Sequence, residues 1–517
     1  MVTQPDLNAT AQINHPSAHA VTTPDKPAVI AATSGAITTY AELDRRSNQV
    51  AALLTARGLV TGDGIAVLMA NGTEWFDVVW GAMRAGLYVT PINWHLTAHE
   101  AAYIINDCEA KALFADASLA DTVARLVDTP TAALRLSTGG ELAGFEPLAA
   151  AVARQPTTAR EGQREGMWMF YSSGTTGVPK GIKPTLPAPE LGGPNAFTML
   201  LVGLYGFGPD VVYLCPAPLY HAAPAGWSTG THRLGGTVVV MDRFDPIEFL
   251  ALIEKHRVTH VQVVPTHLIR LLKLAERDRA RFDLSSLKVL VHAAAPCPAS
   301  VKREVIDWLG PIVYEYYSAS EGSGFTAITS QEWLAHPGSV GRSMLGAVHI
   351  VGPDGGELPV GEEGQIWFES ASQFAYHGDP AKTAQAFNSA GWSTIGDVGR
   401  VDADGYLYLT DRASNMIISG GVNIYPREAE DVLVVHPSVE DVAVIGTPEE
   451  EMGERVTAFI QLREGIAPSD ALADELISYC RERLSTFKCP REIRFVDELP
   501  RLPNGKLLKR LLTQPES

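Results

Sequence analysis

The clearest chemical signal in the sequence is a run of hydroxyl side chains and glycines that leads to a lysine, between Tyr171 and Gly181. The residues of this run that could contact a ligand are Ser172, Ser173, Gly174, Thr175, Thr176, Gly177 and Lys180. Glycines let the backbone approach an anion closely, and hydroxyls, amides and an ammonium group can donate hydrogen bonds to it. The spacing differs from that of the P-loop, because Gly177 follows Gly174 too soon and Lys180 precedes a glycine instead of Ser or Thr. The run predicts a phosphate-binding loop of another kind, with an ordinary Ser- and Gly-rich turn as the alternative.

A second polar segment, Glu315-Tyr316-Tyr317-Ser318-Ala319-Ser320-Glu321, follows the strand-like residues 312–314. The segment places aromatic, hydroxyl and carboxylate side chains next to one another, as a ligand-binding turn can. A solvated acidic turn is the alternative. Upstream, the segment Ala294-Ala295-Pro296 has small side chains and, taken alone, is a strand followed by a turn.

These segments, read together, resemble the adenylate-forming superfamily, which includes acyl-CoA synthetases, luciferases and peptide-synthetase adenylation domains. The resemblance extends from about Thr39 to Arg510. It implies an enzyme that uses ATP and Mg²⁺ to convert a carboxylic acid into an acyl-adenylate with release of pyrophosphate. Transfer of the acyl group to coenzyme A would then release AMP. Within the superfamily, the motifs are most similar to bacterial synthetases for fatty acids or sterol side-chain acids.

The resemblance also implies which residues bind ATP. They would be Ser172, Ser173, Gly174, Thr175, Thr176, Gly177, Lys180, Ala294, Ala295, Pro296, Glu315, Tyr316, Tyr317, Ser318, Ala319, Ser320, Asp397, Arg412 and Lys506. Tyr317 would stack on adenine, and Ala294-Ala295-Pro296 would form the opposite wall of the purine pocket, where small side chains leave room for a flat ring. Ser320 would bind the α-phosphate. Glu321 would hold Mg²⁺, because a carboxylate beside a polyphosphate is repelled unless a hard cation lies between them. Asp397 would accept hydrogen bonds from both ribose hydroxyls while Arg412 adds a donor, with a structural ion pair as the alternative.

Residues for the acid and for the second half-reaction follow from the same resemblance. Lys506, on an Asn-Gly turn, would be catalytic together with Glu321 and Ser320, although a lone lysine there is usually a solvated charge. Gly420 and Gly421 would line the coenzyme A channel, and a Gly-rich helix start is the alternative. The acid would contact His221, Trp227 and Tyr205. Ser414 would occupy the hinge position, where many members of the superfamily carry Lys or Asp.

The elements that must position these residues alternate between strands and helices. Apolar runs lie at 64–69, 86–91, 237–241, 261–265 and 289–293, and helical patterns lie at 40–57, 73–85, 99–108, 246–255 and 266–275. This alternation is typical of parallel sheets covered by helices. Near Gly364 the texture changes to Asp-Gly turns, which indicate a small antiparallel sheet, and an α+β pattern follows Arg412.

Together with the resemblance, the pattern predicts an α/β fold. A large N-terminal domain, residues 1–411, would hold stacked αβαβα sheets, an antiparallel β-subdomain, and the ATP and acyl sites. A small mobile α+β domain, residues 412–517, would hold Lys506 and the thioester-forming loop. We expect residues 1–27 to form a polar arm and the apolar stretch 197–207, which is too short to span a bilayer, to be buried.

Composition limits the class of protein. The chain has 517 residues and a net charge of 41 − 59 = −18, which argues against a nucleic-acid binder, so a polyanionic ligand must meet local positive groups. Five widely spaced cysteines fit neither a disulfide framework nor a zinc site and indicate reduced thiols. No basic and apolar leader is seen at the N-terminus, so we expect a cytoplasmic enzyme without an integral membrane segment. A homodimer is compatible with the sequence.

The sequence says less about which acid is activated and which molecule accepts the acyl group than about the nucleotide site. The motifs carry no buried acidic partner for the ammonium group of an amino acid, which favours an apolar acid such as a fatty, aryl or sterol side-chain acid. An adenylating enzyme that transfers its acyl group to a carrier protein or another acceptor is the first alternative. A non-catalytic protein that binds nucleotide or acyl ligands is the second.

Overall fold

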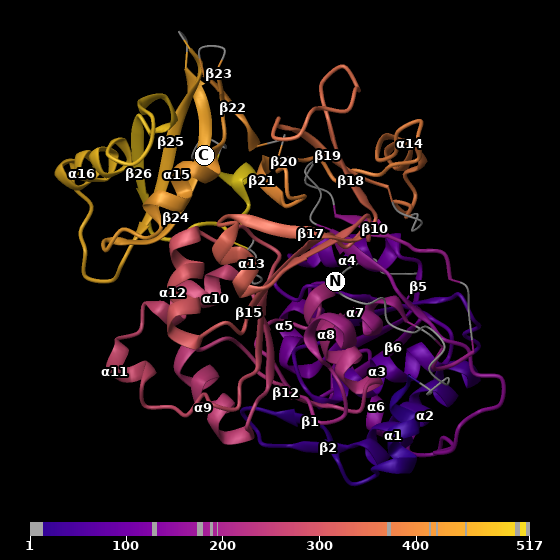
Figure 1. The fold of residues 1–517 in the computed structure, drawn as a ribbon. Coiled ribbons are helices and arrows are strands. Elements are labelled where there is room, and N and C mark those ends of the chain that lie inside the picture. The colour runs from indigo at the N-terminus through magenta and orange to yellow at the C-terminus, as the bar shows by residue number, and fades with distance from the viewer. Residues whose placement is uncertain are drawn as a thin grey trace. The chain divides into compact units, whose positions relative to one another are not determined.

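The structure is a computed structural model, which describes residues 14–126, 132–172, 179–186, 190–193, 195–369, 374–412, 415–419, 422–449, 452–501 and 507–512. The chain divides into two units (Figure 1). The first unit comprises Met1–Val263, Leu274–Val291 and Gln373–Ala384, and the second comprises Val264–Lys273, His292–Ser372 and Gln385–Ser517. The boundary expected after residue 411 falls inside the second unit and stays a prediction.

The first unit consists of two large sheets with their covering helices and a small sheet of two strands, β9 and β10. Its strands are β1 (Pro27–Ala31), β2 (Ile37–Thr39), β3 (Gly64–Leu68), β4 (Tyr88–Pro91), β5 (Ala110–Asp116), β6 (Leu134–Thr138), β7 (Glu146–Pro147), β8 (Met167–Trp168), β9 (Phe170–Ser172), β10 (Lys180–Ile182), β11 (Val212–Cys215), β12 (Thr237–Val240), β13 (His260–Val263) and, up to residue 291, β14 (Val289–His292). Its helices are α1 (Pro16–Thr22), α2 (Tyr40–Ala56), α3 (Thr73–Arg84), α4 (Ala98–Asp107), α5 (Ala120–Val123), α6 (Leu148–Val152), α7 (Ala196–Tyr205), α8 (Ala222–Arg233), α9 (Pro246–His256), α11 (Glu276–Arg279) and most of α14 (Pro380–Gln385).

The two sheets share a helical layer. One sheet has the order β7-β6-β5-β3-β4-β8, and every pair in it is parallel. The other includes β14-β13-β11-β12-β1-β2 and is parallel from β13 to β1. Helix α3 contacts β4 of the first sheet and β1 of the second, so it lies between them. Strands β3, β4, β12 and β13 are buried at every residue, as expected for a sheet covered on both faces. The predicted α/β layers are confirmed.

The second unit contains an antiparallel group of strands and a separate small sheet. Its strands are β15 (Val313–Ser318), β16 (Phe325–Ile328), β17 (Ser339–Leu345), β18 (Ala347–Val351), β19 (Gly364–Glu369), β20 (Asp397–Val401), β21 (Leu407–Arg412), β22 (Ile417–Ser419), β23 (Val422–Ile424), β24 (Val439–Glu449), β25 (Gly453–Leu462) and β26 (Glu492–Val496). Its helices are α10 (Pro265–Leu272), α12 (Ala299–Leu309), α13 (Ser330–Ala335), α15 (Pro426–Leu433) and α16 (Asp470–Arg481).

Both groups of strands agree with the prediction of an antiparallel sheet followed by an α+β region. The order β15-β16-β17-β21-β20-β19-β18 is antiparallel throughout, and its Asp-Gly turns include Gly355 and Gly405 at positive φ. In the other sheet, of order β23-β22-β25-β24, the long strands β24 and β25 pair antiparallel and β26 joins β25 in parallel. Helices α15 and α16 contact each other and, respectively, β24 and β26 (Figure 1). The apolar side chains of these helices and strands form one core cluster.

Two expectations are wrong. The N-terminal stretch is not only an arm, because helix α1 starts at Pro16 after the His15 cap, and His19 contacts the Arg233 carbonyl at 3.0 Å. The apolar stretch 197–207 forms helix α7, which buries Leu201 and Tyr205 but leaves Val202 48% exposed. Helix α7 packs against α8 and leaves its other face exposed, so its apolar composition did not decide its burial.

The remaining expectations concern membrane-spanning segments and the cysteine thiols. No helix of the described residues has the length and apolar character needed to cross a membrane. All five cysteines are free and buried. Burial raises the pKa of Cys108 to about 12 and that of Cys215 to about 11.

Candidate functional site

The predicted phosphate loop joins two antiparallel strands of the first unit, β9 and β10. Their register pairs Ser172 with Lys180 and Tyr171 with Gly181. The Tyr171 hydroxyl donates a hydrogen bond to Oδ2 of Asp107 at 2.5 Å, which anchors the start of the loop to the end of α4. The described residues do not include Ser173, Gly174, Thr175, Thr176 and Gly177, nor the side chain of Ser172. Their predicted contacts with phosphate stay predictions.

Lys180 is the part of the loop that the structure does describe. Its Nζ is shielded from solvent, and no hydrogen-bond partner for it is found among the described residues. Because a buried ammonium group without an acceptor is destabilising, this arrangement suits a site that receives an anion. Gly181 follows at a crowded position, where a Cβ would lie 2.8 Å from Met169 and 2.9 Å from Tyr171.

The residues predicted to contact the acid lie around helices α7 and α8 of the first unit. Tyr205 and Trp227 are brought together, with ring centroids 5.1 Å apart, and both are buried. Aromatic rings of Phe197, Phe207 and Tyr213 also contact Trp227. His221 is the N-cap residue of α8, and its ring lies 4.4 Å from that of Tyr220. Contact of these side chains with an acid stays a prediction.

In the second unit, the residue predicted to stack on adenine is hydrogen-bonded to the residue predicted to bind ribose. The Tyr317 hydroxyl donates to Oδ2 of Asp397 at 2.7 Å. Asp397 is the first residue of β20, is 8% exposed and lies opposite Arg412 in the register of β20 and β21. The side chain of Arg412 is outside the described part of the chain. The structure therefore brings together Tyr317 and Asp397, which are 80 positions apart.

The segment before Asp397 is fixed by backbone hydrogen bonds. Ser393 and Phe368 exchange two of them, at 2.8 and 2.9 Å, and the Thr394 hydroxyl donates to the Ile366 carbonyl at 2.7 Å. The Gly396 amide then donates to the Thr394 hydroxyl at 3.1 Å. These bonds attach the segment to β19, so that the Asp397 carboxylate is held in place by the sheet.

The other residues of 315–321 have different surroundings. Glu315 is buried, and its carboxylate accepts a hydrogen bond from Lys302 at 2.6 Å, so this side chain is directed to an ion pair. The Tyr316 ring stacks on Phe325 with centroids 5.1 Å apart, and the Ser318 hydroxyl donates to the Gly324 carbonyl. Ala319, Ser320 and Glu321 form the turn after β15, which the Gly322 amide closes on the Ala319 carbonyl at 3.0 Å.

The predicted wall Ala294-Ala295-Pro296 follows β14. Ala294 has a φ of 72°, which is uncommon for a residue with a side chain. Ala294 and Pro296 are exposed and Ala295 is half-buried, whereas the flanking Ala293 and Cys297 are buried. Small exposed side chains between two buried anchors form a surface that a flat ring can approach. Such backbone strain is typical of ligand-binding segments.

Several predicted residues of the C-terminal part lie outside the described residues: Lys506, Gly420, Gly421 and Ser414. The predictions for catalysis, coenzyme A and the hinge therefore stay predictions. The flanking structure is described. Ser419 and Val422 pair at the end of the β22–β23 hairpin, and an isolated bridge joins Arg501 to Leu507.

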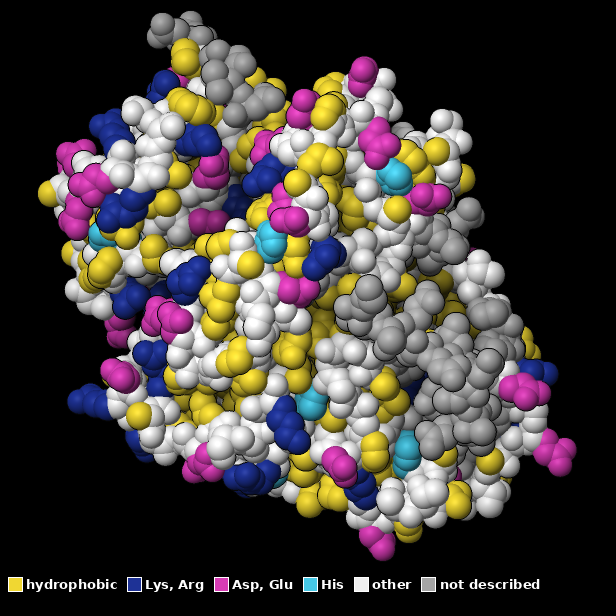
Figure 2. Space-filling view, in the orientation of Figure 1, with side chains coloured by type: hydrophobic (Ala, Val, Ile, Leu, Met, Phe, Trp, Pro, Cys, Tyr) yellow, Lys and Arg dark blue, Asp and Glu magenta, His cyan; other side chains and the backbone are white. Residues whose placement is uncertain are grey.

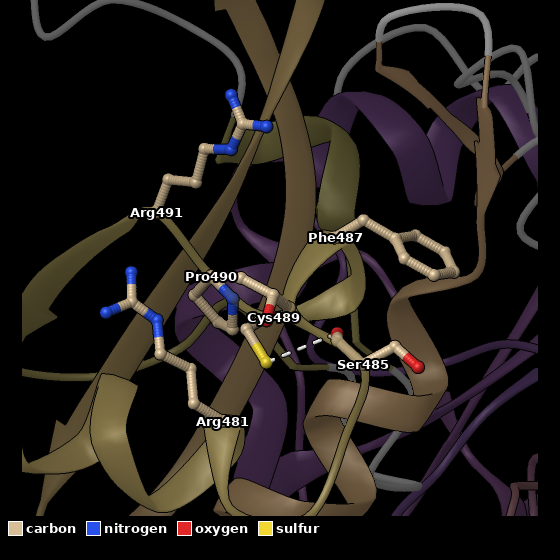
Figure 3. Close-up of a pocket in the computed structure, with 7 residues that line it drawn as sticks. Arg481, Ser485, Phe487, Cys489, Pro490 and Arg491 are labelled. Atoms are coloured by element: carbon tan, nitrogen blue, oxygen red, sulfur yellow. Dashed lines mark hydrogen bonds between the residues drawn. The ribbon is translucent and has the colours of Figure 1, made fainter.

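Two groups of side chains were not predicted from the sequence. A pocket in the second unit is lined by Arg481, Ser485, Thr486, Phe487, Cys489, Pro490 and Arg491. Figure 3 shows the Arg481 and Arg491 side chains on one side of the backbone and the Phe487 ring on the other. Arg491 lies 3.7 Å from Glu449, whereas Phe487 is 45% exposed. Two guanidinium groups on one side can bind an anion. Because the net charge of the chain is −18, an anionic ligand must meet local basic groups such as these.

The second unpredicted group consists of His336, Asp402 and Asp404, whose ligand atoms lie within 4.8 Å of one another. Oδ2 of Asp402 already receives hydrogen bonds from Tyr408 at 3.0 Å and lies 3.2 Å from Nδ1 of His336. These contacts stabilise the Asp-Gly turn between β20 and β21. On the face drawn in Figure 2, basic and acidic side chains are interspersed, and the described residues of that face form no continuous basic stripe.

Comparison with known proteins decides the family. A family model of AMP-binding enzymes matches residues 17–375, and a model of the C-terminal domain of AMP-binding enzymes matches residues 428–506. The chain belongs to the AMP-binding enzymes. The predicted membership of the adenylate-forming superfamily, and the prediction that the chain is an enzyme, are confirmed.

Relatives of this AMP-binding enzyme differ in the acceptor of the acyl group. The long-chain-fatty-acid–CoA ligase FadD13 of Mycobacterium tuberculosis is 31% identical over 488 residues, 93% of each chain. The fatty acid–acyl-carrier-protein ligase ScoC of Streptomyces coeruleorubidus is 30% identical over 512 residues, 96% of this chain and 94% of the relative. The solved amide bond synthetase McbA of Marinactinospora thermotolerans has a TM-score of 0.79 at 29% identity, covering 94% of this chain and 96% of its own.

Proposed function

We propose that this AMP-binding enzyme is an ATP-dependent carboxylic acid:CoA ligase. It forms an acyl-adenylate with release of pyrophosphate, and then acyl-CoA and AMP. The observation that carries the proposal is the hydrogen bond between Tyr317 and Asp397, which joins an aromatic ring suited to adenine to a carboxylate suited to ribose. The buried ammonium group of Lys180 supports it, because this group needs an anionic partner.

The first half-reaction requires positive charge around the phosphates. A carboxylate oxygen of the acid attacks the α-phosphorus, the bond from that phosphorus to the bridging oxygen breaks, and pyrophosphate leaves with the electron pair. Both reactants are anionic, so catalysis depends on orientation and on spreading positive charge over the phosphoryl oxygens. Lys180 and Lys506 supply that charge, while Asp397 and Tyr317 hold the nucleoside in place.

Glu321 is the residue that would hold Mg²⁺. Its carboxylate lies in the turn after β15 and is half-buried, and carboxylate oxygens are ligands that Mg²⁺ accepts. The bound ion would neutralise phosphate charge. Ser320 is exposed in the same turn and can donate its hydroxyl hydrogen to a phosphate oxygen.

The second half-reaction uses the same acyl carbon. The thiol of coenzyme A loses its proton to solvent as its sulfur attacks the carbonyl, the bond to the AMP oxygen breaks, and AMP leaves with the electron pair. We propose that the small domain, residues 412–517, rotates about Ser414 so that Lys506 withdraws and Gly420 and Gly421 approach the thiol. Such a rearrangement separates two chemistries that need the same space.

The acid is an apolar one. Tyr205 and Trp227, predicted to contact it, belong to a buried aromatic cluster around α7 and α8. An apolar acid would contact these rings without requiring a buried charge for its tail. Two of the relatives are named as ligases of fatty acids, which favours the same class.

Another acceptor is the alternative. ScoC is named for transfer to an acyl-carrier protein and McbA for amide bond synthesis, although both resemble this chain over more than nine-tenths of its length. The adenylation half-reaction is common to these alternatives, so only the acceptor distinguishes them.

A panel of short, long, aryl and sterol acids tests the proposal. Pyrophosphate release is measured with ATP and Mg²⁺, with and without coenzyme A, beside a Lys506→Ala variant. We expect pyrophosphate and acyl-CoA from one class of acid, and loss of both in the variant. Pyrophosphate without thioester would indicate another acceptor. If no acid led to pyrophosphate release, adenylation would be contradicted.

A further inference from the structure

A buried ion pair lies in the second unit next to the predicted nucleotide residues. Nζ of Lys302, on α12, donates to Oε2 of Glu315, on β15, at 2.6 Å. The two side chains are 1% and 9% exposed. Nε2 of His292, which is fully buried, lies 3.6 Å from the same carboxylate oxygen. The Trp333 ring, 5.0 Å from the Lys302 ammonium, provides a further favourable contact.

Two members of this group, Glu315 and His292, have shifted pKa values. Although burial opposes ionisation, Lys302, His292 and Arg427 lower the pKa of Glu315, so its carboxylate is ionised. Burial, with a contribution from Lys302, lowers the pKa of His292 to about 4, so its imidazole is neutral at pH 7. The group therefore consists of one cation and one anion, with a neutral imidazole beside them.

Each member of the group lies close in sequence to a predicted wall of the purine site. His292 ends β14 two residues before Ala294, and Lys302 lies in the first turn of α12, which begins just after the same wall. Glu315 and Tyr317 are two positions apart on β15, so both side chains lie on the same face of the strand. Tyr317 in turn holds Asp397.

Stability alone does not account for this pair. Removing two charges from water costs more than their attraction returns in many proteins, and apolar replacements of a buried pair are often neutral or stabilising. A buried pair fixes geometry instead, because both charges must keep their contact. Here the contact joins α12, which follows the wall Ala294-Ala295-Pro296, to β15, which carries Tyr317.

We infer that the Lys302–Glu315 ion pair positions the two walls of the nucleotide site, the segment Ala294-Ala295-Pro296 and Tyr317, at the separation that a purine needs. The pair acts through these walls, so that Glu315, which the resemblance places among the ATP-binding residues, supports the site without touching the nucleotide. The inference rests on the proposed function, since it assumes that the walls bind ATP.

Three variants separate positioning from stability. Lys302→Met leaves a buried carboxylate alone, Glu315→Gln keeps the shape of the side chain without its charge, and the double variant Lys302→Met/Glu315→Leu removes both charges. The matched control is Arg84→Met, because the fully buried side chain of Arg84 pairs with Asp44 at 2.7 Å in the first unit. For each protein, the Tm, the Kd for ATP and the KM values for ATP and for the acid are measured.

We expect Lys302→Met and Glu315→Gln to raise the Kd and KM for ATP at least tenfold, with the KM for the acid within twofold of wild type. The double variant should regain the Tm of the wild type but keep the raised Kd for ATP. Arg84→Met should lower the Tm and leave both KM values within twofold.

The inference is overturned if Glu315→Gln binds ATP as wild type does, or if affinity for ATP follows the Tm across the whole set, the control included. Failure of the proposed function has a different signature. In that case the wild-type protein itself releases no pyrophosphate with any acid, whereas the Kd for ATP still compares the variants.

Discussion

Tyr317 and Asp397 are joined by a 2.7 Å hydrogen bond from the tyrosine hydroxyl to Oδ2 of the carboxylate. The bond links the strand that ends at the predicted Mg²⁺ turn to the first residue of β20. Because Asp397 is 8% exposed, its carboxylate is oriented before any ligand arrives. Orientation in advance lowers the entropy cost of binding.

Tyr317→Phe tests that orientation. A hydrogen bond to a charged group contributes about 1.5 kcal/mol or more, so the KM for ATP should rise about tenfold in steady-state pyrophosphate assays. Tyr408→Phe is the matched control, because the Tyr408 hydroxyl donates to Oδ2 of Asp402 at 3.0 Å outside the predicted site. Equal KM values for ATP in the two variants would contradict the role of Tyr317.

Lys180→Met should separate activity from stability. The substitution removes a buried ammonium group for which the described residues offer no hydrogen-bond partner, so the free energy of unfolding of the ligand-free protein should rise by about 1 kcal/mol. Pyrophosphate release should fall at least a hundredfold, because phosphate charge is left without this cation. Calorimetry and the pyrophosphate assay measure the two effects. A variant that is less stable than wild type would show that the ammonium group is satisfied without a ligand.

Stability should fall below pH 6.5 because of His232. The Trp80 indole N–H donates to its Nδ1 at 3.1 Å, and its Nε2 lies 3.0 Å from the Ala28 carbonyl, so the neutral ring satisfies both partners. Burial lowers the pKa of His232 to about 4. Between pH 6.5 and about 4, His232 is therefore protonated in the unfolded chain but neutral in the folded protein. The free energy of unfolding decreases as pH falls through this range.

The loss from His232 should reach about 2 kcal/mol at pH 5 relative to pH 7.5. Urea unfolding followed by tryptophan fluorescence measures it. His232→Gln should be less stable than wild type at pH 7.5 and should show a shallower decline with acid. An unchanged slope would mean that other groups carry the pH dependence.

Gly341→Ala should prevent normal folding of the antiparallel sheet. Gly341 has a φ of 97°, and a Cβ there would lie 2.0 Å from the Ala327 carbonyl oxygen on the neighbouring strand β16. Backbone cannot move aside cheaply, so we expect a loss of more than about 3 kcal/mol. Gly355→Ala is the control, because its φ of 82° is similar but no atom lies within 4 Å of the added Cβ. That variant should lose only about 1 kcal/mol, from backbone strain. Denaturant unfolding compares the two, and equal losses would rule out the clash.

The sequence predicted the regular elements well where a single periodicity dominates. The apolar run at 64–69 forms β3, and the helical pattern at 40–57 forms α2, which starts with a capping box of Thr39 and Glu42. Helix α2 depends on contacts close in sequence, whereas β3 pairs with β4 and β5 and is recognised by its unbroken apolar run. Helix α1 was missed because it has seven residues and depends on contacts such as that of His19 with Arg233, 214 positions away.

The resemblance predicted the residues of the candidate site one by one, without the contacts between them. The motifs around Tyr317 and Asp397 identified each residue separately, but no periodicity encodes a bond across 80 positions. The Lys302–Glu315 pair could not be predicted, because lysine and glutamate are rarely buried. The pocket with Arg481 and Arg491 lacked a motif, although the net charge of −18 indicated that local basic groups must exist.

The five buried thiols have a practical consequence for experiments. A thiol reacts as the thiolate, and burial raises the pKa of Cys480 to about 12 and raises that of Cys297 and Cys489 as well. A cysteine introduced at an exposed position, such as Ile418, would therefore meet a maleimide long before any native thiol does. Pairs of exposed cysteines can therefore be introduced for fluorescent probes without first replacing the five native cysteines.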